Sequence, residues 1–501
     1  MSDQVDLLVI GGGVNGAGIA RDAAGRGLSV VMCEKDDLAQ GTSSRSGKLI
    51  HGGLRYLEYY EFRLVREALI EREVLMNAAA HIIWPMRFVL PHSPTDRPAW
   101  LVRLGLFLYD HLGGRKKLPG TRVLDLRRDP EGAAILNKFI KGFEYSDCWV
   151  DDARLVVLNA VAAKEAGAGV LTRTAVHSLQ VERNGWHAVL KNTKTGQEHA
   201  LHAKAVANAA GPWVNDVIGR VARSNSKRSI RLVKGSHIIV PKFWEGQQAY
   251  LVQNHDKRVI FINPYEGDKA LIGTTDISYD GIPDTVEADQ DEVDYLIAAV
   301  NRYFKQKLRP SDVLEKFAGV RPLFDDGQGN PSAVTRDYVL DLETTRGAPI
   351  LNVFGGKITT YRKLAEHAVD ELKTVFPNMT QAWTAKAPLP GGDMPSADFE
   401  TFLGVLQDQY PWLPRDLAKH YARLYGTRAH HIIGTGQTLA SLGEHFGALL
   451  YEAEVLYLIE NEWAQTAQDI LIRRTKHGLN ISETETQKLE DWFHERMAKS
   501  A

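Results

Sequence analysis

The chain has 501 residues, of which 44% are hydrophobic and 24% charged, values close to those of an average soluble globular protein. This composition excludes a disordered, collagen-like or disulfide-scaffold chain, and the length predicts about three folded units, or two with one of them large. Lys and Arg number 60 against 62 Asp and Glu, so the net charge of −2 provides no overall field for nucleic acid. We therefore expect no nucleic-acid partner and only local recognition of anions.

Three features of the chain indicate a cytoplasmic location. The N-terminus has no positively charged segment and no cleavage site of a secretory signal. No stretch of about 18 uncharged apolar residues occurs, so we expect no membrane-spanning helix. The two cysteines, Cys33 and Cys148, form neither a disulfide framework nor a metal-ligand pattern, which fits a reducing compartment and a site without metal.

The first 34 residues have the pattern of a βαβ unit. A continuously apolar run at 6–10, typical of a strand buried on both faces, leads through a glycine-rich turn into an alanine-rich helical segment at 17–25. Residues 28–34 then predict a second strand. This order predicts an α/β fold with a Rossmann-like parallel sheet.

The turn of this unit carries a dinucleotide fingerprint. Gly11, Gly13 and Gly16 form a GxGxxG pattern, which permits a tight turn, close approach of the backbone to a pyrophosphate, and close helix–strand packing. The helix N-terminus supplies amide donors to the phosphates. Glu34 ends the second strand, where an acid accepts hydrogen bonds from the ribose hydroxyls.

The loop at 42–56 follows the second strand and is rich in polar groups. Its His51 has an unperturbed pKa of about 6.5, which suits a group that accepts a proton near neutral pH. Arg55 can bind a phosphate or carboxylate through two donors. The alternatives are a structural role for His51, bonded to a carbonyl, and a surface ion pair for Arg55.

Two helices are predicted after this loop. Residues 61–77 have the spacing of an amphipathic surface helix, and residues 98–112 are unusually apolar for a short helix. Three cations follow at 115–117, so the second segment could lie in a membrane interface as a monotopic anchor. The alternative is a buried helix with Arg103 and Asp110 paired on its polar edge.

The middle of the chain is predicted to be rich in strands. Residues 176–206 alternate and contain two glycine turns, which predicts β-hairpins, and residues 231–276 are also strand-like. Residues 205–213 form an apolar strand and a small-residue turn containing Gly211, which resembles the second dinucleotide-contact motif of two-domain flavoproteins.

Residues 351–360 predict a strand, a Gly-Gly turn and the start of a helix near Lys357. Such a helix could direct its N-terminal amides toward a flavin carbonyl, which becomes anionic on reduction. The fingerprint alone does not distinguish FAD from NAD. This segment, the turn at Gly211 and their distance along the chain from the fingerprint together favour FAD.

Two basic groups precede this segment. Arg321 lies in the segment GVRPL at 319–323 and Arg336 in VTRDY at 334–338, and a small anionic substrate would need such cations to converge from different segments. The alternative is that both arginines pair with the nearby carboxylates of Asp325, Asp326 or Asp337.

A Pro/Gly-rich stretch at 388–392 predicts a domain boundary, because the chain beyond about residue 396 has an all-helical, charged pattern.

Several of these segments closely resemble bacterial aerobic, FAD-dependent glycerol-3-phosphate dehydrogenases, within the wider glycine-oxidase and D-amino-acid-oxidase-like superfamily. The most specific are KLIHGGLRY at 48–56 and VFGGKITTYRKLAEHA at 353–368, and GFEYSDCWVDDARLV, NAAGPWV, KGSHIIVP, IGTTD and GVRPL also match. The resemblance covers essentially the whole chain. One departure is Gly47, where the family usually has a serine or threonine.

The resemblance implies three domains. An FAD-binding domain is interleaved with an antiparallel substrate-binding domain, and an all-helical C-terminal cap domain follows. The expected boundaries are 1–90, 145–215 and 315–388 for the first, 91–144 and 216–314 for the second, and 393–501 for the third.

The resemblance also implies the reaction. The protein would oxidise sn-glycerol 3-phosphate to dihydroxyacetone phosphate, with hydride transfer to non-covalent FAD and electron transfer to ubiquinone or menaquinone. It would bind peripherally to the inner face of the cell membrane, and the oligomeric state, a homodimer included, stays open.

The family motifs assign roles to residues of this sequence. The expected substrate contacts are Arg55, Tyr56, Arg321, Arg336 and Lys357. The candidate catalytic groups are His51, His237, Arg321 and Lys357, with the choice of base between the two histidines open. The expected cofactor contacts are Gly11, Gly13, Asn15, Gly16, Glu34, Thr42, Ser43, Ser44, Lys48, Leu49, His51, Gly211, Gly356, Lys357 and Thr359.

Two other functions compete with this reading. A glycerol-3-phosphate oxidase that passes electrons to oxygen would share the fold, and the membrane-facing surface would distinguish the two. A flavin-binding scaffold or redox sensor without turnover would not need His51, Arg55 and Arg321.

Overall fold

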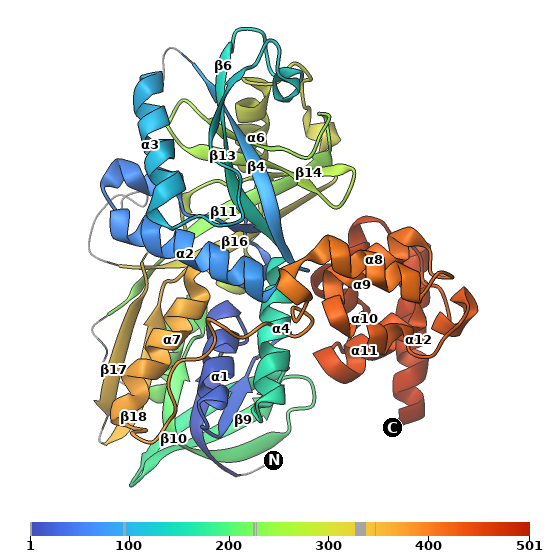
Figure 1. The fold of residues 1–501 in the computed structure, drawn as a ribbon. Helices are drawn as coiled ribbons and strands as arrows, with labels where there is room; N and C mark the ends of the chain where they lie inside the picture. Colours follow the sequence, from blue (N-terminus) through green and yellow to red (C-terminus); the bar gives the residue numbers. More distant parts are fainter. Residues whose placement is uncertain are drawn as a thin grey trace.

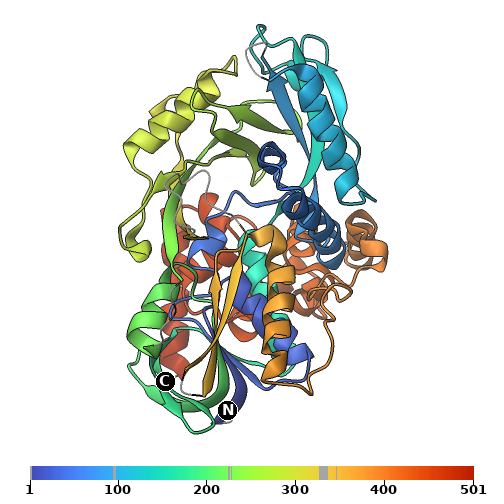
Figure 2. The same ribbon diagram turned by 90° about the vertical axis from the view of Figure 1, so that its left-hand side faces the viewer.

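The structure, a computed structural model, describes residues 3–93, 97–223, 226, 228–325, 337–345 and 347–500. Two β-sheets lie one above the other, and a helical domain packs beside them (Figure 1). The view turned by 90° shows the same stacking of the sheets (Figure 2). This agrees with the predicted α/β class and its helical C-terminal cap.

The lower sheet in Figure 1 is the Rossmann-like one, and the described residues contribute eight strands to it. Five neighbouring strands, in the order β18-β10-β1-β2-β7, are parallel, and β17 pairs antiparallel with β18 at one edge. The strands are β1 (Gln4–Ile10), β2 (Val30–Cys33), β7 (Gly169–Leu171), β8 (Thr174–Glu182), β9 (Gly185–Asn192), β10 (Glu198–Asn208), β17 (Val339–Thr345) and β18 (Ala348–Phe354).

Both faces of this sheet are covered, which explains the continuously apolar run of β1. Three helices pack on one face: α1 (Val14–Gly25), α4 (Asp152–Glu165) and α7 (Tyr361–Glu371). The antiparallel β8–β9–β10 meander covers the opposite face of the sheet, where the side chain of Trp186 is fully buried. The predicted hairpins at 176–206 are confirmed by this meander.

The upper sheet has ten strands, in the order β15-β11-β14-β13-β12-β4-β6-β3, with β16 paired to β11 and β5 to β6. Among the described strands its pairs are antiparallel except β4 with β12, which are parallel. The strands are β3 (Leu49–Ile50), β4 (Ile83–His92), β5 (Arg122–Asp125), β6 (Lys141–Val150), β11 (Ile230–Pro241), β12 (Ala249–Gln253), β13 (Val259–Tyr265), β14 (Lys269–Gly273), β15 (Ile277–Ser278) and β16 (Glu315–Phe324).

Helices α2 (Phe62–Ala78), α3 (Ala99–Leu112) and α6 (Gln290–Asn301) lie beside the upper sheet (Figure 1). The first two confirm the predicted helices at 61–77 and 98–112. The surface character expected of α2 is wrong for much of its length, because Glu71, Arg72 and Glu73 are buried beside its apolar side chains.

The sheets divide the chain at other residues than the predicted domain boundaries. Strands β3 and β16 and most of β4 fall in segments that we assigned to the FAD-binding domain, but they pair with β6 and β11 of the upper sheet. Strand β6 itself crosses the expected boundary at 145. The sequence pattern shows that a segment is a strand but not which neighbour it pairs with, so these assignments needed the tertiary structure.

The C-terminal domain is helical and has a hydrophobic core of its own, as the Pro/Gly stretch predicts. It lies beside α4 in Figure 1. Within the described residues, no helix combines the length and apolarity needed to span a bilayer. The helices are α8 (Phe399–Gln409), α9 (Arg415–Tyr425), α10 (Ala429–Ile433), α11 (Glu452–Glu462) and α12 (Glu483–Ser500).

Candidate active site

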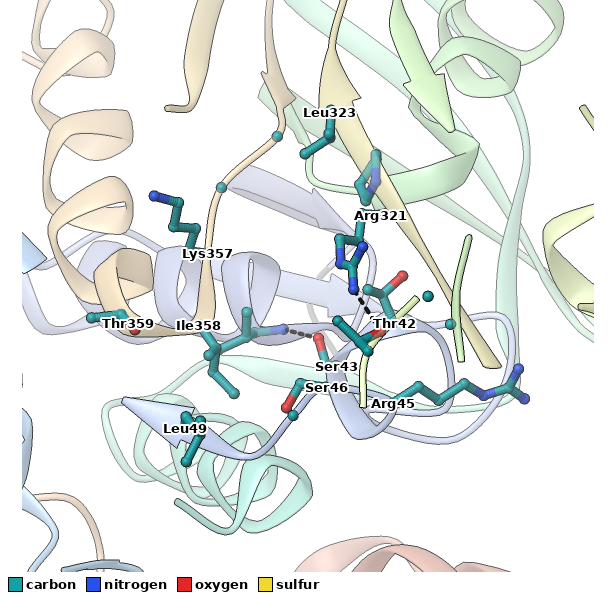
Figure 3. A pocket seen from close by; sticks show the side chains of 18 of the residues that line it. Thr42, Ser43, Arg45, Ser46, Leu49, Arg321, Leu323, Lys357, Ile358 and Thr359 are labelled. Carbon is teal, nitrogen blue, oxygen red and sulfur yellow. Dashed lines mark hydrogen bonds between the residues drawn. The ribbon is translucent and has the colours of Figure 1, made fainter. Parts of the chain in front are cut away.

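A cavity of about 910 Å³ lies between the carboxyl ends of β1, β2, β10 and β18 and the second sheet. In α/β folds with parallel sheets, ligands bind at this edge. Figure 3 shows part of the wall, with Lys357 and Thr359 on one side and Arg321 above Thr42. Segments distant in sequence therefore meet around one space.

The fingerprint glycines are required by the backbone geometry. Gly11 has φ of +109°, and a Cβ there would lie 2.5 Å from the carbonyl oxygen of Ala209. A Cβ on Gly16 would lie 1.9 Å from the carbonyl oxygen of Gly11. The tight turn and the close packing of α1 against it thus both depend on glycine. Gly11 and Gly13 line the cavity, whereas Gly16 does not line it and serves the packing of α1 against the turn.

The N-terminus of α1 faces the cavity. The backbone N–H of Val14 donates to the Ser43 hydroxyl at 3.0 Å, and the Asn15 side chain donates to the Gly355 carbonyl at 3.2 Å. These contacts join the fingerprint turn to the loop after β2 and to the Gly-Gly turn after β18. Amide donors and the helix dipole make this a favourable place for phosphate.

Glu34 is held at the end of β2. Its two carboxylate oxygens accept hydrogen bonds from the backbone N–H groups of Gly12, at 2.7 Å, and Asp36, at 2.9 Å. Burial raises the pKa of the Glu34 carboxyl, and these two donors act against that shift. Each oxygen has a second lone pair, so the carboxylate can still accept from a ribose hydroxyl.

Two cations of the cavity wall contact tyrosines. The Lys357 ammonium lies 4.0 Å from the centroid of the Tyr56 ring, and Arg55 donates to the Tyr59 hydroxyl at 3.4 Å. In the described part of the chain neither cation pairs with a carboxylate. The surface ion pair considered for Arg55 is therefore not found there.

Arg321 is both a residue of the cavity wall and a member of an ion pair. It lines the cavity, and it donates to Asp276 at 3.0 Å and to the Thr274 hydroxyl at 2.9 Å. The carboxylate 3.0 Å from the Arg321 guanidinium is thus that of Asp276, which was not among the carboxylates considered from the sequence. Arg336 lies outside the described residues.

The two histidines considered as the catalytic base, His51 and His237, differ in their surroundings. His51 is half-buried, with its ring edge-on to Phe261 and its backbone N–H donating to the Thr359 hydroxyl at 3.2 Å. His237 is buried and stacks on Phe317, with ring centroids 5.0 Å apart. Burial, and then the positive charges of Arg321 and Lys48, lower the pKa of His237 to about 3. His237 is therefore neutral, and a very weak base, at physiological pH.

Not every expected cofactor contact reaches the cavity. Ser44 and Lys48 do not line it. The Lys48 ammonium is buried, 2.7 Å from a carboxylate oxygen of Asp152 and 3.1 Å from the Ser44 carbonyl oxygen, so it neutralises a buried charge. Apart from Gly16, the other expected contacts line it, among them Thr42, Ser43, Leu49, Gly211, Gly356 and Thr359.

The wall also contains residues that the sequence analysis did not single out, among them Phe261, Thr274 and Asp276. Phe261 lies within a strand, and the other two follow one in the IGTTD segment. Ordinary strand patterning hides them, since nothing in their spacing marks them as facing a ligand.

The site fits a flavin dinucleotide. It joins a glycine cradle at a helix N-terminus, an acid at the end of β2 and a second helix start beginning with residues 358–360. Comparison with known proteins agrees: residues 6–362 match the model described as FAD dependent oxidoreductase. The chain belongs to this family. Residues 382–496 match the model described as C-terminal domain of alpha-glycerophosphate oxidase. FAD is thus the cofactor of this flavoprotein, as expected.

Individual relatives cover nearly the whole chain. It is 70% identical over 491 residues to the D-erythritol 1-phosphate dehydrogenase of Brucella abortus, covering 98% of each chain. It is 49% identical over 491 residues to the aerobic glycerol-3-phosphate dehydrogenase of Escherichia coli, covering 98% of this chain and 97% of that one. A Bacillus halodurans glycerol-3-phosphate dehydrogenase, solved with FAD, superposes with a TM-score of 0.76 at 28% identity, covering 98% and 94% of the two chains.

Proposed function

We propose that this flavoprotein dehydrogenates the secondary hydroxyl of a short polyol phosphate, oxidising sn-glycerol 3-phosphate to dihydroxyacetone phosphate. The observation that carries the proposal is a pair of cations in the wall of a dinucleotide-binding cavity, Arg55 and Lys357, for which the described residues provide no carboxylate partner. Relatives named for the oxidation of glycerol 3-phosphate support it.

The phosphate is bound by these cations. Arg55 offers a planar fork of donors, and Lys357 offers a point charge held above Tyr56. A phosphate dianion between them would replace the water that now solvates both groups. Because the phosphate is remote from the reacting carbon, its binding energy can orient the hydroxyl for reaction.

His51 accepts the proton of the substrate's C2 hydroxyl. Its half-buried ring lies in the cavity wall beside the segment that begins with Lys357, and the Thr359 contact fixes its backbone. His237 is the weaker candidate because its lowered pKa leaves it little basicity. Arg321, held by Asp276 and Thr274, stabilises negative charge on the substrate oxygen.

The bound FAD supplies the hydride acceptor for the substrate carbon. The residues that would hold it are the glycine turn, Glu34 and the backbone of the segment after β18. The helix that starts beyond Lys357 presents its N-terminal amides to the cavity, where they favour negative charge.

A second substrate, D-erythritol 1-phosphate, is favoured by two observations. The relative named for it is 70% identical, against 53% and 49% for two relatives named for glycerol 3-phosphate. Gly47 lines the cavity, and a Cβ there would lie 3.7 Å from the His237 ring. The missing side chain leaves room for the extra hydroxymethylene group that distinguishes this substrate.

One experiment tests cofactor, reaction and substrate together. Either phosphate is added without oxygen to the purified holoenzyme, and bleaching of the flavin absorbance is followed. We expect both to bleach it rapidly, and glycerol, which lacks the phosphate, to bleach it far more slowly. Failure of both phosphates would overturn the proposal, and the ratio of their kcat/KM values identifies the preferred one. Gly47→Ser should shift that ratio toward the three-carbon substrate.

We also propose that the electron acceptor is a membrane quinone and that α3 lies in the membrane surface. Trp100, Leu104 and Phe107 are exposed on this helix by 68%, 46% and 56%, whereas Leu106 is fully buried. One face of α3 therefore packs in the core, which agrees with the alternative of a buried helix. The opposite face is exposed and available for contact with lipid.

The position of α3 supports a lipid-dissolved acceptor over oxygen. Leu101, Leu104 and Leu108 line the cavity, so the apolar face adjoins its entrance. Exposed Lys116 follows the helix, as expected for a segment that meets anionic headgroups. Faster turnover with oxygen, yielding peroxide, than with a quinone in liposomes would instead identify an oxidase.

A further inference from the structure

Three side chains with metal-binding atoms converge in the helical domain, away from the cavity. They are His420 of α9, Glu454 of α11 and His477, which begins a 3₁₀ turn at His477–Leu479. One potential ligand atom from each lies within 4.8 Å of the others. No cysteine takes part, so the cysteine count of the sequence gave no indication of this group.

The distances suit a metal ion between these atoms. The Nε2 atoms of His420 and His477 are 3.3 Å apart, and the His420 Nε2 is 2.8 Å from a carboxylate oxygen of Glu454. Two nitrogen ligands at about 2.05 Å from a tetrahedral zinc ion are separated by roughly 3.3 Å. The nitrogens are thus already at the spacing of a shared ion.

The surroundings leave ligand capacity unused. Glu454 is fully buried, and its second carboxylate oxygen has no hydrogen-bond partner among the described residues. The first oxygen accepts a hydrogen bond from the Tyr425 hydroxyl at 2.6 Å, which orients the carboxylate as outer partners of metal ligands do.

We propose that His420, Glu454 and His477 bind one zinc ion, with a water molecule as the fourth ligand. Two imidazoles and one carboxylate form a ligand set that suits zinc and related divalent transition metals. The ion would stabilise structure rather than take part in the reaction, since none of its ligands lines the cavity.

The site would fix the segment that follows α11. Arg473 and Arg474, shortly before His477, both donate to Asp37 in the loop after β2, at distances of 2.5 to 2.8 Å. A metal bond from His477 to α9 and α11 anchors this segment within the helical domain. The ion would thereby strengthen the junction of that domain with the nucleotide-binding sheet.

Metal content tests the proposal directly. The holoenzyme is treated with a chelator, reloaded with Zn²⁺, freed of excess metal by gel filtration and analysed by mass spectrometry. We expect about one zinc per chain in the wild type and less than about one fifth of that in His420→Ala and Glu454→Gln. His431→Ala, at an exposed histidine of the same domain, should retain the wild-type content. Equal zinc in all four proteins, or none in the wild type, overturns the proposal.

A second measurement uses the wild type alone, in case a variant fails to fold. Co²⁺ bound by two nitrogens and two oxygens gives visible bands at longer wavelength than the flavin maximum, and Zn²⁺ should abolish them. The chelated protein should also unfold about 3–6 °C lower than the zinc-loaded one. Absence of the bands and an unchanged Tm would show a hydrogen-bonded Glu–His–His chain without metal.

Discussion

Two sets of cations in this molecule differ in what surrounds them. Arg154 and Arg474, at the junction between the helical domain and the nucleotide-binding sheet, are fully buried, and each meets a carboxylate of another element. Arg55 and Lys357, in the cavity, are half-buried and contact tyrosines, with no carboxylate partner in the described part of the chain.

The difference separates structural from functional charge. A buried guanidinium without a counterion is very costly, so the junction arginines must be satisfied within the fold. Arg154 pairs with Glu462. Burial favours the protonated form of the Asp37 carboxyl, but the charges of Arg474 and Arg473 outweigh it and lower the pKa of Asp37. A half-buried cation stays solvated and can exchange that water for a ligand, so the cavity cations are free to bind an anion.

Breaking a junction pair should have the largest effect on stability. Arg154→Ala leaves Glu462 as an uncompensated buried charge, so we expect the free energy of unfolding to fall by about 3–5 kcal/mol in urea titrations. Arg428→Ala is the matched control, because its pair with Glu165 is partly exposed and should contribute less than about 1 kcal/mol. Similar losses in both variants would contradict the distinction.

Removing the proposed base should affect the reaction and not the fold. His51→Asn should lower kcat by roughly 10²–10⁴-fold while flavin content and Tm stay near those of the wild type. His237→Asn should lower kcat far less, because His237 has little basicity at neutral pH. If only His237→Asn is inactive, the base is His237.

Removing a cavity cation should likewise leave stability unchanged. Arg55→Ala should reduce kcat/KM for the phosphorylated substrate. The loss should correspond to about 2–4 kcal/mol of transition-state stabilisation, the range for truncating one partner of a buried charged contact. The slow reaction with glycerol should hardly change, and Tm should stay within about 2 °C. Equal losses with both substrates would assign Arg55 a structural role.

Buried neutral histidines are a third case, which a pH titration can measure. Burial is the first cause that lowers the pKa of both His81 and His237 to about 3. Between about pH 6.5 and 3 the unfolded chain binds protons at these positions and the folded chain does not. The free energy of unfolding should therefore fall as the pH falls, by about 1.4 kcal/mol per pH unit for each histidine.

His237→Gln should reduce this slope by the share of one histidine, whatever its effect on stability at pH 7. His431→Ala, at a histidine that is exposed in the fold, serves as the control. A slope unchanged in His237→Gln would mean that His237 is protonated in the folded protein.

The exposed face of α3 should give the smallest effect per residue. Leu104→Ser combined with Phe107→Ser should weaken binding to anionic liposomes about 10-fold and slow quinone reduction, while activity with a soluble dye stays near normal. Val405→Ser, at an exposed valine of α8, is the control. Loss of dye activity to the same extent would show that these side chains support the fold.

The local elements were determined by the sequence. The apolar run before Gly11 formed a buried strand because hydrogen bonds to two neighbours leave both faces in the core, and only glycine fits its turn. The position of Glu34 at the end of the second strand also follows from the local sequence. The Pro/Gly stretch separates two independent hydrophobic cores. Spacing and residue type suffice for such features because they depend on neighbours in sequence.

The tertiary structure alone decided partners and exposure. It placed β4 and β16 in the upper sheet, paired Lys48 with Asp152 and turned Leu106 inward while Phe107 stayed exposed. It also brought His420 and His477 together, 57 residues apart. Pairing, burial and charge compensation depend on atoms far away in the chain, and so does whether a cation such as Arg55 is left available for a ligand.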